Sequence, residues 1–142
     1  MEQRISLITL SVTDLARSRY FYEHGLGWQP SSASNEQVSF FQTGSMVLAL
    51  YGKTALAQDA QLAPEGTGFG GIALAYNVRQ REEVDVVLAE AQAAGATLLT
   101  SAQETDWGGY AGYFADLDGY PWEVAWNPHF PLLDDGSVQL PQ

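Results

Sequence analysis

The chain lacks cysteine and contains few basic residues. With no cysteine among 142 residues, disulfide bonds, thiolate metal sites and a cysteine nucleophile are all excluded. Six Lys and Arg residues stand against seventeen Asp and Glu residues, so the formal net charge is −11 at pH 7. A negative field of this size repels phosphates, so neither nucleic acid nor an anionic membrane is an expected partner. The same acidity keeps a protein soluble and can concentrate cationic small molecules near a cleft.

Long hydrophobic runs are also missing. The N-terminus begins Met-Glu-Gln-Arg, and no apolar stretch has the length of a signal peptide or a membrane span. We therefore expect a cytoplasmic protein. The chain is 46% hydrophobic, which at this length supports one compact domain over residues 1–142 rather than two independent ones.

A hairpin near the C-terminus organises the rest of the sequence. Two aromatic-rich runs, 107–115 and 120–126, flank Asp-Leu-Asp-Gly at 116–119, which predicts two strands joined by a tight turn. Strand alternation puts Trp122 and Val124 on one face and Glu123 on the other. Because an unpaired buried charge is costly, we expect Glu123 to face a cavity or water.

The first half of the chain predicts a strand, a helix and three more strands. Residues 5–12 alternate in hydrophobicity, and Thr13 or Asp14 can cap a helix that ends near His24. Strands are expected at about 27–32, 37–42 and 46–51. The stretch 52–69 shows no sustained period, so we expect an exposed connector or flap there.

The second half repeats this plan. A strand is expected at 71–78, a helix at 81–94 and a short strand at 97–101, followed by the hairpin. The internal similarity predicts an α+β fold of two tandem βαβββ modules, 5–51 and 70–127, with connector 52–69 and a C-terminal tail at 128–142. The tail carries apolar residues that can dock on this chain or on a partner.

Two motifs give the sequence a family resemblance. The opening run Val12-Thr13-Asp14-Leu15-Ala16-Arg17 and the closing run Tyr113-Phe114-Ala115-Asp116-Leu117-Asp118-Gly119 with Trp122-Glu123-Val124 resemble the glyoxalase/bleomycin resistance protein/extradiol dioxygenase superfamily, also called vicinal oxygen chelate. Leu117 stands where that pattern usually has Pro. The resemblance spans about residues 5–127 and implies two curled mixed sheets that form a cleft.

The resemblance also locates the metal ligands of metal-using members. The corresponding positions are Leu7, Leu48, Gly71 and Glu123. Only Glu123 can coordinate a cation, whereas an open catalytic site needs at least three N or O donors. His24 ends a helix and His129 lies in the tail, so both are expected outside the cleft. The chain is therefore identified as a member that lacks the usual metal-binding histidines, with no metal or cofactor expected.

Without a metal, the expected cleft lining is mostly small or apolar. It comprises Leu7, Thr9, Met46, Leu48, Leu50, Gly71, Ala73, Ala75, Glu123 and Ala125. Trp107 and Tyr110 flank Gly108-Gly109, where a flexible loop can lay aromatic rings over the opening. The candidate ligand-binding residues are thus Leu7, Thr9, Leu48, Gly71, Trp107, Tyr110 and Glu123.

Three functions remain open from the sequence, beside a purely structural dimerisation unit, which would have a filled cleft. The first is metal-free binding of a small apolar or cationic aromatic molecule, similar to the antibiotic-sequestering members of the superfamily. The second is a cofactor-independent lyase or isomerase with Glu123 as the catalytic general base. The third is a metal-dependent lyase or dioxygenase with non-standard ligands. The resemblance also implies a homodimer.

Overall fold

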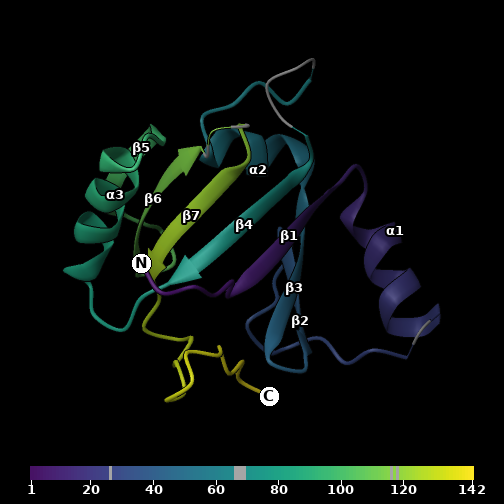
Figure 1. Ribbon diagram of the computed structural model, residues 1–142. Helices are drawn as coiled ribbons and strands as arrows, with labels where there is room; N and C mark the ends of the chain where they lie inside the picture. The colour runs from purple at the N-terminus through teal and green to yellow at the C-terminus, as the bar shows by residue number, and fades with distance from the viewer. Residues whose placement is uncertain (26, 66–69, 116, 118) are drawn as a thin grey trace.

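The computed structural model describes residues 1–25, 27–65, 70–115, 117 and 119–142. Its elements are β1 (Leu7–Val12), α1 (Leu15–Tyr20), η1 (Phe21–Gly25), β2 (Val38–Thr43), β3 (Met46–Gly52), α2 (Lys53–Asp59), β4 (Ile72–Asn77), α3 (Glu83–Ala93), β5 (Thr97–Glu104), β6 (Tyr110–Ala115) and β7 (Pro121–Trp126). The strands form one mixed seven-stranded sheet in the order β2-β3-β1-β4-β7-β6-β5 (Figure 1). The expected α+β fold class is confirmed.

The opening strands of the two halves lie at the centre of the sheet. β1 and β4 pair antiparallel, with Leu7 opposite Ala75 and Leu10 opposite Ile72. Each then pairs in parallel with the last strand of its own half, β1 with β3 and β4 with β7. The two halves therefore repeat about the β1–β4 pair, as the internal similarity of the sequence predicts.

Helices α1 and α3 cover one face of the sheet. On α3, Val84, Val87 and Leu88 are buried against Tyr76, Phe114 and Val124 of the strands below. Asp14 caps α1 by accepting a hydrogen bond from the backbone N–H of Arg17 at 3.0 Å, as the sequence predicts. None of the described helices is long and apolar enough to cross a membrane.

Two other segments pack on the opposite face. Helix α2 buries Leu56 and Ala57 against Ala73 of β4. The C-terminal tail buries Phe130, Val138 and Leu140 in a cluster with Leu7, Val47 and Ala75 of the central strands. In Figure 1, α2 and the tail lie at opposite ends of the strands.

The strand expected at 27–32 does not form. Pro30 has no N–H donor, and Ser31 and Ser34 instead make single hydrogen bonds to the edge of β2. The backbone N–H of Ser31 donates to the carbonyl of Phe40 at 2.9 Å, and the Ser34 hydroxyl accepts from the N–H of Phe40 at 2.9 Å. The segment thus covers the β2 edge without forming a ladder.

The connector prediction is wrong for residues 53–59. That stretch is helix α2, and its Leu56 is only 2% exposed. Its seven residues span two turns, too few for a hydrophobic period to show in the sequence. Residues 66–69 of the expected connector lie outside the described residues. The same is true of Leu26, and of Asp116 and Asp118 in the expected hairpin turn.

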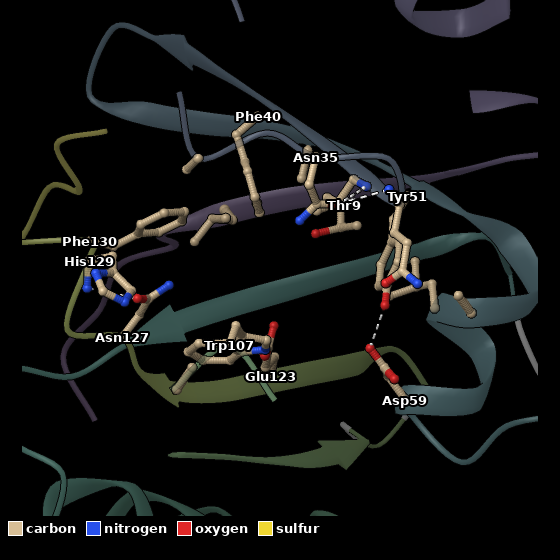
Figure 2. A pocket seen from close by; sticks show the side chains of 18 of the residues that line it. Thr9, Asn35, Phe40, Tyr51, Asp59, Trp107, Glu123, Asn127, His129 and Phe130 are labelled. Atoms are coloured by element: carbon tan, nitrogen blue, oxygen red, sulfur yellow. Dashed lines mark hydrogen bonds between the residues drawn. The ribbon is translucent and has the colours of Figure 1, made fainter. Parts of the chain in front are cut away.

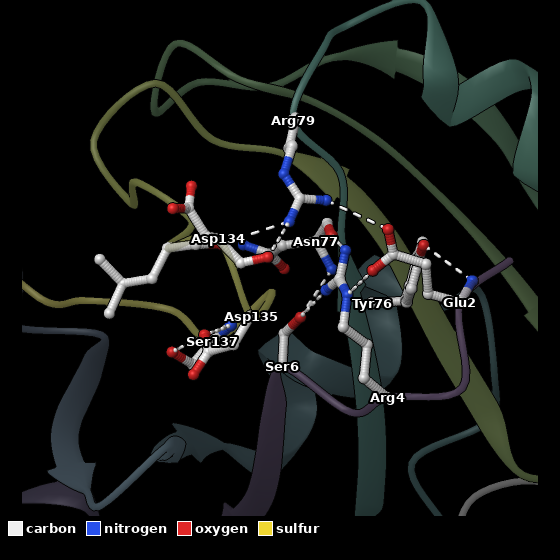
Figure 3. A network of polar contacts seen from close by, with 10 residues as sticks. Glu2, Arg4, Ser6, Tyr76, Asn77, Arg79, Asp134, Asp135 and Ser137 are labelled. Carbon is white, nitrogen blue, oxygen red and sulfur yellow. Dashed lines mark hydrogen bonds and ion pairs between the residues drawn. The ribbon is translucent and has the colours of Figure 1, made fainter.

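Arg4 joins the N-terminal segment to the end of β4, and Arg79 joins the same segment to the tail (Figure 3). The guanidinium of Arg4 donates to Glu2 at 2.6 Å, to the Ser6 hydroxyl at 3.1 Å and to the carbonyl of Asn77 at 2.7 Å. Arg79 donates to the other oxygen of Glu2 at 3.1 Å and to the Asp134 carbonyl at 3.2 Å. Glu2 is thus shared by both guanidinium groups, and the tail is held at the end of β4.

The contact between β6 and its neighbours gives a stability prediction. A Cβ added at Gly112 would lie 2.6 Å from Leu88 Cδ1, 2.8 Å from the Thr100 carbonyl oxygen and 2.9 Å from the Ala102 nitrogen. Two of these atoms belong to the backbone, so the strands must separate. We expect Gly112→Ala to lower the free energy of unfolding by about 1–3 kcal/mol in urea denaturation.

Gly52→Ala is the matched control. Gly52 has φ −56°, and no heavy atom lies within 4 Å of a Cβ built there, so alanine fits without strain. Equal denaturation midpoints for the two variants would show that the close approach at Gly112 does not constrain the sheet.

Candidate ligand-binding cavity

A cavity of about 820 Å³ opens on the sheet face between α2 and the tail (Figure 2). Its lining residues come from the central strands, from 32–40, from α2, from the turn before β6 and from the tail. They are Leu7, Thr9, Ser32, Ala33, Asn35, Gln37, Val38, Phe40, Ala49, Tyr51, Ala55, Leu56, Gln58, Asp59, Asn77, Asp106, Trp107, Tyr113, Glu123, Ala125, Asn127, His129, Phe130 and Pro141.

Glu123 lies on the sheet floor of this cavity. Its neighbours on the adjacent strands are Ala75 of β4 and Tyr113 of β6. Burial, and after it the negative charge of Asp59, raise the pKa of Glu123 from its ordinary value near 4.5, while a hydrogen bond with Tyr113 lowers it, and the net result is a pKa of about 7. Part of the side chain still faces the open cavity. Glu123 therefore changes its charge near neutral pH at a surface a ligand can reach.

A second carboxylate lies at the α2 end of the cavity. The phenol of Tyr51 on β3 donates to Asp59 Oδ2 at 2.9 Å, as Figure 2 shows. Partial burial raises the pKa of Asp59, the Tyr51 hydrogen bond lowers it, and the nearby charge of Asp106 raises it. Burial, and after it the negative charge of Asp59, raise the pKa of Tyr51. The phenol therefore keeps its proton and stays a donor.

Trp107 enters the cavity from a turn that its neighbours hold in place. The backbone N–H of Thr105 donates to the Gly109 carbonyl at 3.0 Å, and the Thr105 hydroxyl accepts from the Gly109 N–H at 2.9 Å. The indole ring lies over Gly109, where an added Cβ would come within 1.8 Å of Trp107 Cζ3. Glycine at 109 therefore lets the ring fold back over its own turn.

The charge on the cavity wall has one sign. Asp59, Asp106 and Glu123 all line it, and no Lys or Arg is among its described lining residues. The three carboxylates act on one another, because Asp59 raises the pKa of Glu123 and Asp106 raises that of Asp59. A cation entering the cavity would relieve this repulsion, whereas an anion would add to it.

Four of the predicted site residues meet at this cavity. Leu7 and Thr9 of β1, Trp107 and Glu123 all line it. The predicted alternation on β7 is also confirmed, since Trp122 and Val124 pack in the α3 core while Glu123 faces the cavity.

The other three predicted residues lie elsewhere. Leu48 of β3 pairs with Ile8 and Phe41 and comes directly before Ala49, which faces the cavity. Because successive residues of a strand point to opposite faces, Leu48 points to the face that α1 covers. Gly71 precedes β4 and does not line the cavity. Tyr110 faces α3, where its phenol donates to Asp85 at 3.0 Å and Arg81 lies 4.0 Å from its ring centroid.

The lining is more polar than the sequence suggested, and His129 was misplaced. Ala73 and Ala75, expected in the lining, are covered by α2 and by the tail. Polar side chains take their place, including Tyr51, Asp59, Asp106, Tyr113, Asn77, Asn127 and His129. The tail turns back over the sheet and brings His129 to the cavity, contrary to the expectation that it lies outside.

Some of these missed residues carried a signal. Tyr113 lies within β6, directly opposite Glu123, so the hairpin pairing alone could have found it. Asn127 continues the alternation of Glu123 and Ala125, so the strand pattern could also have found it. Asp59 belongs to the unpredicted helix α2, and His129 depends on where the tail docks, so no local pattern identified these two positions.

The comparisons with known proteins agree with this fold. The family model described as Glyoxalase/Bleomycin resistance protein/Dioxygenase superfamily matches residues 4–124. The chain belongs to this superfamily. A glyoxalase-related enzyme from Fulvimarina pelagi is 39% identical, with 99% of this chain and 100% of that chain covered and a TM-score of 0.52. None of the curated proteins matches the chain.

More distant superfamily-like structures support the fold alone. A structure described as an NAD-dependent benzaldehyde dehydrogenase from Legionella pneumophila is 20% identical over 85% of this chain and 97% of that chain, with a TM-score of 0.66. A superfamily member from Vibrio splendidus is 16% identical over 87% and 98% of the two chains, with a TM-score of 0.55.

The divalent ion of metal-using superfamily members does not fit the residues present. Across the sheet, the row through Glu123 reads Val47, Leu7, Ala75, Glu123 and Tyr113, so one carboxylate stands among alkyl groups and a phenol. Within the described part of the chain, no three His, Cys, Asp or Glu residues are grouped so that they could hold a metal ion. An open catalytic site needs more donors than this.

The raised pKa of Glu123 predicts a pH-dependent stability. Between about pH 4.5 and 7 the folded protein keeps a proton on Glu123 that the unfolded chain has lost, so stability falls as pH rises through this window. Glu123→Gln removes the ionisation. We expect this variant to gain on the order of 1–3 kcal/mol over the parent protein at pH 8 and almost nothing at pH 4, as measured by urea denaturation.

Glu82→Gln, an equal change of charge at the exposed start of α3, should show no such pH-dependent gain. A stability difference for Glu123→Gln that is equal at pH 4 and pH 8 would contradict the raised pKa.

Proposed function

We propose that the protein binds a small cationic aromatic molecule, an arylalkylamine, in this cavity without a metal ion. The supporting observation is that Asp59, Asp106 and Glu123 line one cavity that has no Lys or Arg among its described lining residues. Trp107 and Tyr51 add aromatic rings to the lining beside these carboxylates. An ammonium group is attracted both by aromatic rings and by carboxylates. The volume of about 820 Å³ is in the range of small-molecule sites.

The proposal predicts pH-dependent binding of a simple amine. We expect 2-phenylethylamine to bind about tenfold more tightly at pH 8 than at pH 6 in isothermal titration calorimetry, because Glu123, with a pKa of about 7, is ionised only at the higher pH. Glu123→Gln should weaken binding at pH 8 by about ten- to a hundredfold and remove most of the pH dependence.

Two controls accompany this titration. Glu82→Gln removes a carboxylate far from the cavity and should leave the affinity unchanged, which separates a local contact from the net charge of the protein. Addition of EDTA should also leave the affinity unchanged. The proposal fails if the amine does not bind, or if binding requires a divalent ion.

A second candidate is a cofactor-independent lyase or isomerase with Glu123 as the general base. The observation that favours it is a carboxylate with a pKa of about 7 beside the phenol of Tyr113, since general bases work best near ambient pH. For a carbonyl substrate that also binds the variant, Glu123→Gln should abolish exchange of the α-proton in D₂O, as followed by NMR. Exchange at the parent rate in that variant would exclude this role.

The homodimer and the cytoplasmic location stay predictions.

A further inference from the structure

The cavity has chemically different ends. At the α2 end, Asp59 accepts from Tyr51, and Figure 2 shows this pair on the opposite side of the cavity from Asn127, His129 and Phe130. The tail end carries an amide and an imidazole but no carboxylate among its labelled residues. Glu123 and Trp107 lie between the two ends in the same view. A ligand that fills the cavity therefore meets negative charge at one end and neutral hydrogen-bonding groups at the other.

Strand β7 spaces these groups along the floor. Glu123, Ala125 and Asn127 all line the cavity, as alternate residues of an extended chain do. At roughly 3.3 Å per residue, the Cα atoms of Glu123 and Asn127 are about 13 Å apart. Both side chains reach inward from these points, which leaves room for one aromatic ring with a short substituent at each end. Ala125 has only a methyl group, so the middle of the floor is open to a ring.

The amide of Asn127 is oriented by the tail. Its Oδ1 accepts a hydrogen bond from the backbone N–H of His129 at 2.9 Å, so the amide NH₂ is the group that Asn127 can offer to a ligand. The imidazole of His129 lines the cavity beside it and can donate or accept. Together they suit a neutral oxygen, such as a phenol, a carbonyl or an amide, better than an alkyl end.

We infer that the ligand is an arylalkylamine with a neutral oxygen group at the end of the ring remote from its ammonium group. The ammonium group pairs with Glu123 and Asp59, the ring lies over Ala125 beside Trp107, and the oxygen meets Asn127 and His129. This inference rests on the proposed function and adds a second recognition point to it. A carboxylate or phosphate at the far end is disfavoured, because the cavity wall already carries three acidic groups.

A matched pair of probes tests the second recognition point. Tyramine differs from 2-phenylethylamine only by a para-hydroxyl group, so the ratio of their dissociation constants isolates the far end of the cavity. At pH 8 we expect the parent protein to bind tyramine about three- to tenfold more tightly by calorimetry. His129→Ala and Asn127→Ala should each reduce that ratio toward one while leaving the affinity for 2-phenylethylamine unchanged.

Two further variants separate the ends. Glu123→Gln should weaken both amines by the same factor and keep their ratio. Gln92→Ala, which truncates a neutral amide on the exposed side of α3 and outside the cavity, should change neither affinity nor ratio. Because Asn127 also shapes the turn into the tail, the His129 variant decides the outcome if Asn127→Ala unfolds.

The outcomes distinguish this inference from the proposed function. If both amines bind the parent protein equally well, or if the ratio survives in His129→Ala, the second recognition point does not exist and the amine site stands. If neither amine binds, the proposed function fails and this inference fails with it.

Discussion

The antiparallel pairing of β1 with β4 is the constraint on which the structure depends. It joins two halves with similar strand order into one sheet and fixes which side chains share a face, because Leu7 and Thr9 stand opposite Ala75 and Ala73. The helices of the two halves then cover one face. The other face would be exposed, and the chain covers it from two ends, with α2 against Ala73 and the tail against Leu7 and Ala75. The cavity is the part of that face which neither segment reaches.

Charge distribution gives this cavity its character. Four of the basic residues are engaged elsewhere: Arg4 joins the N-terminal segment to the end of β4, Arg79 holds the tail, Arg81 lies over Tyr110, and Arg19 pairs with Glu23. The sheet floor therefore carries a carboxylate with no cationic partner beside it. A buried acid of this kind is tolerated because it can hold its proton near neutral pH and because a phenol on the next strand supports it. The unpaired carboxylate of Glu123 lowers the stability of the folded state when it is ionised, and the same lack of a partner favours an approaching cation.

Much of the fold could be predicted from the sequence, whereas only part of the candidate site could. Alternation placed Glu123 correctly because the bulky Trp122, Val124 and Trp126 leave only one face for the core. The same reasoning failed on β3, where Leu48 and Leu50 alternate with Val47, Ala49 and Tyr51. Both faces of that strand are apolar, so hydrophobicity could not show which set of alternate residues faces the cavity. The prediction chose the set that contains Leu48, and the structure has the other set there.

The remaining misses are tertiary in origin. Asp59 and His129 reach the cavity only because α2 and the tail pack on the sheet, and no local pattern encodes those contacts. Helix α2 is short, and the tail has little regular structure beyond the bridge between Leu132 and Val138. Such segments are stabilised by the surface that they cover rather than by their own propensity.

The tail that closes one side of the cavity follows the last strand of the sheet. The ladder of the sheet is complete at Trp126, so the tail adds no strand to it. Changes in the tail that keep its buried Phe130, Val138 and Leu140 would therefore alter the size of the cavity and the groups at its tail end while the strand register stays as it is.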